Sequence, residues 1–259
     1  MRDDEIDEAR ENRVLTDWCA LTNDVQGLCV DLWDRTSSWT GLNTDPAAFS
    51  MMLFKRAYGH IRAFSLLYNA KFFRDADGCA RSAVEVAICL ANLAARREAF
   101  VEEMRSDAAV TTKGQIPIWS GGDAAFGREA SAEMARVFGE RRKDGGKHEK
   151  LDMKAVADGA GLPQLYRWYR HFSGTRVHVT GLSILADAVA VGDEEHEQRI
   201  DTYARLRRID ALATAGGATV ISCEAHSKVH GIDDLHDRAA ELMRRMSTLG
   251  PTDIFADKS

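Results

Sequence analysis

Apolar residues recur every three or four positions through most of the chain, the spacing that places them on one face of an α-helix. Near the N-terminus this spacing predicts a helix over residues 4–33, with apolar positions at Val14, Leu15, Trp18, Leu21, Val25 and Leu28. A second helix is predicted from Pro46 to Lys71, because Thr44-Asp45-Pro46 places a capping side chain directly before a proline. Its core face should contain Met52, Ala57, His60 or Ile61, Phe64 and Leu67.

The most apolar part of the chain lies between Ala83 and Ala95, where Glu85 and Asn92 are the only strongly polar residues. A helix that is apolar on nearly all sides belongs in the middle of a bundle. We therefore expect a buried central helix over about residues 79–105, preceded by a turn at residues 74–78.

The remaining sequence completes an all-α fold. Residues 106–150 are rich in glycine, threonine and charge, so we expect a loop-rich excursion with one helix at 124–138. Further helices are predicted at residues 163–172, 177–191, 193–230 and 233–246. The prediction is a single domain over residues 1–259, a multi-helix bundle of about seven to nine helices. Two ends should stand apart from it, an N-terminal helical extension at residues 1–40 and a flexible tail at 250–259.

The composition of the chain indicates in which cellular compartment we expect the protein. The formal net charge is −6, from 34 basic and 40 acidic residues, which gives no overall electrostatic reason to bind nucleic acid or an anionic membrane. The charged N-terminus has no apolar core of a secretion signal, and no apolar run approaches membrane-spanning length. Five cysteines without a CxxC pair indicate reduced thiols. We expect a cytoplasmic protein with no membrane partner.

The first candidate for chemistry is a polar stripe on the central helix. Arg81, Glu85 and Asn92 fall within about 40° of one another on a helical wheel. A buried carboxylate without partners would cost several kcal/mol, so groups from elsewhere in the fold should meet this stripe. The alternative interpretation is an ion pair that only fixes how the helices pack.

The second candidate is the segment from Tyr166 to His178. Tyr166, Tyr169 and Ser173 share one helical face, so their hydroxyls should line up. The segment also forms a local basic patch suited to phosphate or carboxylate groups. Its candidate substrate-binding residues are Arg167, Arg170, His171 and Arg176. A solvated helix face with Trp168 and Phe172 packed inside is the alternative.

A third candidate is Cys223-x2-His226-x3-His230, in which the two histidines are one helical turn apart and could share a metal ion. The chain lacks a second short ligand pair to complete such a set, and histidines near a helix C-terminus are commonly just favourable cations. We therefore predict no metal site and no cofactor.

Two of these motifs carry a family resemblance. Arg81-x3-Glu85 on a buried helix, followed by Tyr169-x3-Ser173-x4-His178, resembles a widespread microbial family of all-helical proteins of unknown function (DUF5677). The resemblance covers roughly residues 54–246. It implies that Arg81, Glu85, Tyr169, Ser173 and His178 form a site.

That family is distantly similar to the HEPN helical bundles, many of which are RNA-cleaving toxins or defence effectors that dimerise. The resemblance implies a metal-independent ribonuclease of phage defence or a toxin–antitoxin system, with those five residues as catalytic. It also implies a homodimer, with RNA and a partner or antitoxin protein as binding partners. Between residues 166 and 178, no arginine and histidine have the spacing that is usual in the HEPN motif. The alternative is a non-catalytic sensing or protein-interaction module whose polar cluster is structural.

Overall fold

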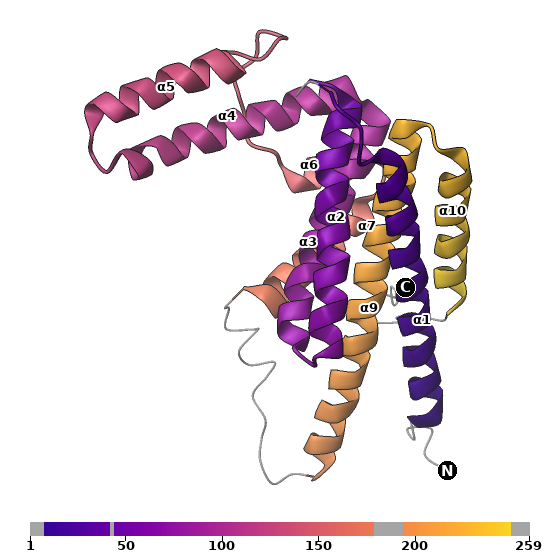
Figure 1. Ribbon diagram of the computed structural model, residues 1–259. Coiled ribbons are helices and arrows are strands. Elements are labelled where there is room, and N and C mark those ends of the chain that lie inside the picture. The colour runs from indigo at the N-terminus through magenta and orange to yellow at the C-terminus, as the bar shows by residue number, and fades with distance from the viewer. Residues whose placement is uncertain (1–7, 42–43, 179–193, 250–259) are drawn as a thin grey trace.

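The computed structural model describes residues 8–41, 44–178 and 194–249, and the described residues form helices without any β-strand. The predicted all-α bundle is confirmed. Its main helices, α1 (Glu8–Thr36), α2 (Pro46–Asn69), α3 (Phe73–Arg96), α9 (Glu194–His230) and α10 (Asp233–Thr248), lie roughly along one direction (Figure 1). The shorter α6 (Met153–Gly159) and α7 (Pro163–Phe172) pack beside α3.

The centre of the bundle is α3, as the apolar run predicts. It packs mainly against α9 and α2, and also against α7 and α6. Val84, Ala87, Ile88, Leu90 and Leu93 are fully buried along it. Contrary to the expectation that no apolar run approaches membrane-spanning length, α3 is long and apolar enough to cross a membrane, but a buried core helix passes the same test.

The first helix is part of the bundle rather than an extension from it. Trp18 is only 4% exposed, and Leu21, Val25 and Leu28 lie with it in one apolar core shared by α1, α2, α9 and α10. Trp33 packs against Tyr58 of α2, with 6.2 Å between ring centroids. Trp18 therefore lies in the core of the chain, and Trp33 packs against that core.

The helix predicted at residues 79–105 is two helices. The chain turns at Arg97, whose φ of 44° lies in the left-handed region, and α4 (Glu98–Ser120) leaves in a new direction. The predicted turn at residues 74–78 is instead the first turn of α3, with Asp75 favourably placed at its N-terminal end.

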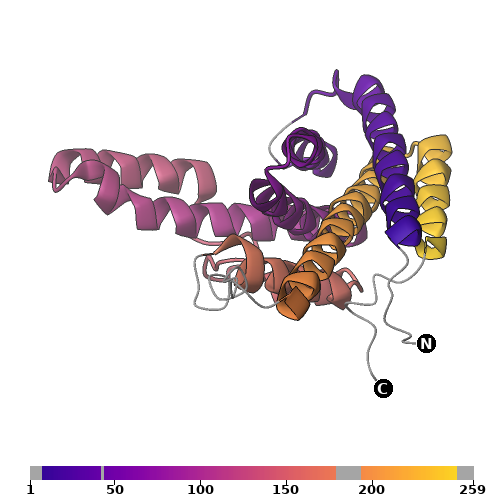
Figure 2. The ribbon, with the colours of Figure 1, turned by 90° about the horizontal axis from the view of Figure 1, so that it is seen from below.

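The excursion after α3 is a helical arm. Helix α4 continues to Ser120, through residues 111–120 that the sequence predicts as a loop, and it contains Pro117. Helix α5 (Ala124–Phe138) returns alongside it, with the predicted boundaries, and the pair projects away from the bundle (Figures 1 and 2). The proline is tolerated because it sits in the last turn on an exposed surface, where water can satisfy the carbonyl that lost its donor.

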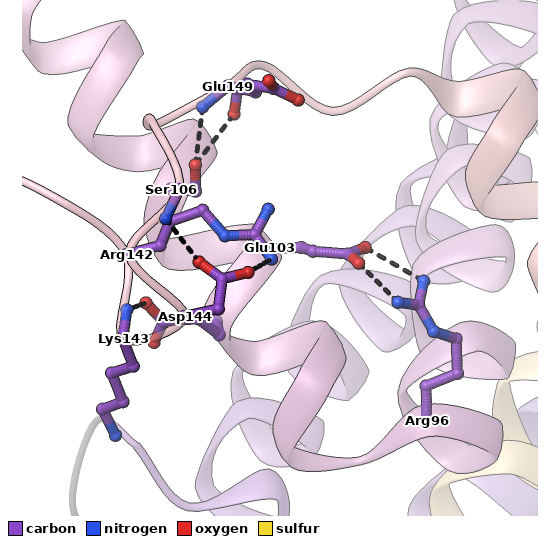
Figure 3. A network of polar contacts seen from close by, with 9 residues as sticks. Arg96, Glu103, Ser106, Arg142, Lys143, Asp144 and Glu149 are labelled. Atoms are coloured by element: carbon purple, nitrogen blue, oxygen red, sulfur yellow. Dashed lines mark hydrogen bonds and ion pairs between the residues drawn. The ribbon is translucent and has the colours of Figure 1, made fainter.

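Polar contacts fasten the return segment to the base of the arm (Figure 3). The Ser106 hydroxyl accepts a hydrogen bond from the backbone N–H of Glu149 at 2.7 Å, and Asp107 accepts one from Leu151 at 3.0 Å. Arg96 at the end of α3 forms an ion pair with Glu103 of α4. The segment that follows α5 therefore has fixed attachments along α4.

The later boundaries follow the sequence closely. The predicted helix at residues 163–172 is α7, and the last two predicted helices are α9 and α10, each within two residues of its predicted ends. The short α6 is not predicted. The helix expected at residues 177–191 falls mostly outside the described residues. Gly216 and Gly217 mark close packing in α9, because a Cβ at Gly216 would lie 3.0 Å from Met246 and one at Gly217 would lie 3.6 Å from Trp168.

Candidate functional site

Four of the five predicted catalytic residues meet around one guanidinium group. Arg81 donates hydrogen bonds from Nη1 to Glu85 at 2.7 Å, from Nη2 to the Tyr169 hydroxyl at 2.7 Å and from Nε to Ser173 Oγ at 3.2 Å. The guanidinium carbon also lies 4.4 Å from the centroid of the Tyr169 ring. We call Arg81, Glu85, Tyr169 and Ser173 the Arg81 cluster.

Helical spacing assembles the cluster from two elements. Arg81 and Glu85 are one turn apart on α3, and Tyr169 and Ser173 are one turn apart where α7 runs into a π-helical turn, η1 (Ser173–Val177). Both α7 and η1 pack on α3. The two sequence motifs therefore face each other.

The cluster is partly open to solvent. The side chain of Arg81 is 18% exposed and that of Glu85 is 40% exposed, whereas Ser173 is buried. Glu85 is therefore only partly buried, although it lies on the helix predicted to be the buried centre of the bundle. Asn92, the third member of the predicted stripe, is fully buried but belongs elsewhere, since its amide donates to the backbone carbonyl of Val156 in α6 at 2.5 Å.

The fifth predicted residue, His178, lies just beyond η1. Its side chain is exposed, and its backbone N–H donates to the carbonyl of Ser173 at 3.2 Å. His178 is thus an exposed residue directly after the turn that carries the Ser173 hydroxyl.

Helix α2 supplies two residues that sequence reasoning missed. Burial and the charge of Arg56 lower the pKa of His60, while the negative charge of Glu85 acts in the opposite direction. His60 is half-buried, and its imidazole is therefore mainly neutral at physiological pH. It lies close enough to Glu85 for the two side chains to interact electrostatically. Arg56 and His60 are one turn apart on α2, and this spacing was the available signal.

The basic residues of α7 differ in their exposure to solvent. Arg167 and Arg170 are exposed, and Tyr166 stacks near Tyr169 with 6.1 Å between centroids. For His171, burial and the charges of Arg176 and Arg207 lower the pKa to about 4. Its side chain is half-buried.

Arg176 is a structural residue rather than a surface cation. Its side chain is 2% exposed, pairs with Asp210 of α9 and lies 3.5 Å from Asp77 of α3. Its guanidinium carbon also lies 4.3 Å from the centroid of the Phe172 ring. The predicted substrate-binding role of Arg176 is not compatible with this burial. Its ion pairs instead hold η1 against α3 and α9.

The histidines of the third candidate are used in packing. The two nitrogens of His226 lie 2.7 Å from the Ser50 hydroxyl and 3.1 Å from the Thr36 hydroxyl, and its ring stacks on Phe54. Cys223 faces Cys29, with 3.5 Å between the sulfur atoms. Within the part of the chain that the structure describes, no group of three or more His, Cys, Asp or Glu side chains could hold a metal ion.

Comparison with protein families places these motifs in context. The sequence matches the family described as "Family of unknown function (DUF5677)" over residues 47–197, more than half of the chain. The chain belongs to DUF5677. The DUF5677 match contains both motifs of the Arg81 cluster, whereas α1, α10 and most of α9 lie outside it. No match was found among curated proteins or among solved structures.

Removal of the Arg176 charge should destabilise the DUF5677 fold strongly. Arg176→Met removes the partner of the buried Asp210 carboxylate and leaves Asp77 with Arg207 alone, so the free energy of unfolding should fall by about 3–5 kcal/mol in urea denaturation. Arg244→Met is the matched control, because Arg244 forms an exposed ion pair with Glu241 and its loss should cost less than about 1 kcal/mol. Equal effects of the two changes would contradict the structural role of Arg176.

Acid should weaken the fold through His226. Burial and the neighbouring His230 lower the pKa of His226 to about 3. An unfolded histidine has a pKa of about 6.5, so below that pH the unfolded chain binds a proton that the folded chain does not. The free energy of unfolding should therefore fall as pH drops from about 6.5 towards about 3, by several kcal/mol in total.

The His226→Gln variant isolates this contribution. Burial raises the pKa of Asp77 and Asp210, which acts in the opposite sense on stability, but both carboxyls are present in wild type and variant. Urea denaturation at several pH values should show a flatter pH dependence in His226→Gln. Parallel curves for the two proteins would contradict the role of His226.

Proposed function

We propose that the Arg81 cluster is a site at which the protein binds and cleaves single-stranded RNA without a metal ion. The observation that carries the proposal is that Arg81 holds the Tyr169 hydroxyl, the Ser173 hydroxyl and Glu85 at one partly open point. A hydroxyl that accepts a hydrogen bond from a guanidinium keeps its own hydrogen to donate. Tyr169 can therefore donate to a phosphoryl oxygen where negative charge develops.

The groups around the cluster suit an RNA strand. Arg167 and Arg170 are exposed on the same helix as Tyr169 and can contact phosphates. The stacked pair Tyr166 and Tyr169 offers an aromatic surface for a base. This local arrangement supports RNA binding although the chain as a whole carries a net charge of −6.

The reaction needs one group to remove a proton and another to return one. His60, neutral beside Glu85, takes the proton of the ribose 2′-hydroxyl, and the 2′-oxygen attacks phosphorus. The bond between phosphorus and the 5′-oxygen breaks, and the leaving oxygen receives a proton from His178. The products are a 2′,3′-cyclic phosphate and a free 5′-hydroxyl. Tyr169 stabilises the intermediate charge.

Single-stranded RNA incubated with the purified protein in excess EDTA should be cleaved to products with 2′,3′-cyclic phosphate ends, resolved by gel electrophoresis. Tyr169→Phe keeps the ring but loses the donor, so the cleavage rate should fall by about a hundredfold or more. His60→Ala and His178→Ala should also lose cleavage. The matched control His236→Ala, on α10, should cleave as wild type does. Inert wild-type protein, or equal rates in wild type and Tyr169→Phe, would refute the proposal.

A second candidate is a non-catalytic module in which the Arg81 cluster only joins α3 to α7. It is favoured by the fact that all three guanidinium nitrogens of Arg81 already donate within the protein. In this case the protein senses a ligand or binds a partner elsewhere, and the cluster contributes to stability alone.

Arg81→Ala measures this structural contribution. Because Glu85 is 40% exposed and can be solvated, we expect a loss of about 1–3 kcal/mol in the free energy of unfolding, smaller than for Arg176. Tyr169→Phe should lose about 1 kcal/mol by the same urea measurement. Stability unchanged in both variants would exclude the structural module, whereas a stability loss with no RNA cleavage in wild type would favour it.

A further inference from the structure

A cavity of about 140 Å³ lies on the side of α3 that faces α9, apart from the Arg81 cluster. Residues of α2, α3 and α9 line it: Tyr68, Phe73, Arg74, Asp77, Ala204, Arg207, Arg208 and Ala211. Its walls combine aromatic and aliphatic surface with guanidinium groups. That combination is typical of sites for small organic molecules that carry a charged group.

A buried hydroxyl in this cavity lacks a partner. Tyr68 is 9% exposed, and among the described residues no group forms a hydrogen bond with its hydroxyl. Its ring is held by Phe64 and Phe73, at 5.4 Å and 5.2 Å between centroids. A buried hydroxyl without a hydrogen bond destabilises the fold, and most such groups in proteins are satisfied. The Tyr68 hydroxyl thus carries a hydrogen that no described group accepts.

The described lining carries more positive than negative charge. It contains three arginines and one carboxylate, Asp77, which already contacts Arg176 and Arg207. Arg208 lies over the Phe73 ring, with its guanidinium carbon 4.5 Å from the centroid. This contact places the Arg208 guanidinium against the aromatic wall of the cavity, where its N–H groups can donate to an acceptor.

We propose that this cavity binds a small organic carboxylate. The carboxylate accepts hydrogen bonds from the Tyr68 hydroxyl and from Arg208, and the apolar part of the ligand packs against Phe73 and Ala211. The volume of about 140 Å³ suits a group about the size of a substituted benzene, since an apolar cavity of about 150 Å³ accommodates benzene itself. The proposal is independent of RNA cleavage, because it uses none of the residues of the Arg81 cluster.

Titration calorimetry on the full chain tests the proposal with four probes: benzoate, isovalerate, benzyl alcohol and inorganic phosphate. At least one of the two carboxylates should bind with one ligand per chain. Benzyl alcohol lacks the charge and phosphate lacks the apolar part, so both should bind at least tenfold more weakly. One hydrogen bond to a charged group is worth about 1.5–3 kcal/mol, so Tyr68→Phe should weaken carboxylate binding about tenfold or more.

The variants separate binding from folding. Tyr68→Phe removes a hydroxyl that has no partner to lose, so its melting temperature should not fall. Tyr58→Phe is the matched control on α2, because Tyr58 packs against Trp33 outside the cavity, and it should bind as wild type does. Arg208→Gln should weaken carboxylate binding as well. The proposal is overturned if neither carboxylate binds, if phosphate or benzyl alcohol binds equally well, or if Tyr68→Phe binds as wild type does.

Discussion

The arrangement of the candidate site depends on one buried charge, the guanidinium of Arg176. It pairs with Asp210 of α9 and contacts Asp77 of α3, and so fixes the π-helical turn that begins at Ser173. Because isolated charges are expensive to bury, these three side chains can be accommodated only together. The turn therefore has one position relative to α3, and the Ser173 hydroxyl is placed against Arg81 by a contact three residues further along the chain.

Arg176 and Arg81 both connect α7 and η1 to α3, but they differ in their exposure to solvent. Arg176 is sealed between helices, whereas Arg81 is 18% exposed and its partner Glu85 is 40% exposed. The first contact is suited to fixing geometry, and the second is suited to meeting a ligand from solvent. Exposed Arg167 and Arg170 lie beside the open contact. The proposed site therefore includes exposed basic residues of α7, although the chain as a whole carries a net charge of −6.

Part of the candidate site could be predicted from the sequence, and part could not. That Arg81, Glu85, Tyr169 and Ser173 come together could be predicted, because residues four apart share a helix face and buried polar groups need partners. His60 could not be found in this way, since its proximity to Glu85 depends on how α2 packs on α3. The burial of Arg176 was missed for the same reason. Its partners, Asp77 and Asp210, are 99 and 34 residues away in the chain.

The sequence by itself determined the helices whose signals are local. The cap at Asp45 and the proline after it start α2, and the boundaries of α5 and α7 coincide with their patterns of apolar residues. Only the tertiary structure decided the turn at Arg97, the helical arm through residues 111–120 and the attachment of Asn92 to α6. These features rest on contacts between distant segments, whose free energy outweighs the small local preferences that the sequence pattern reports.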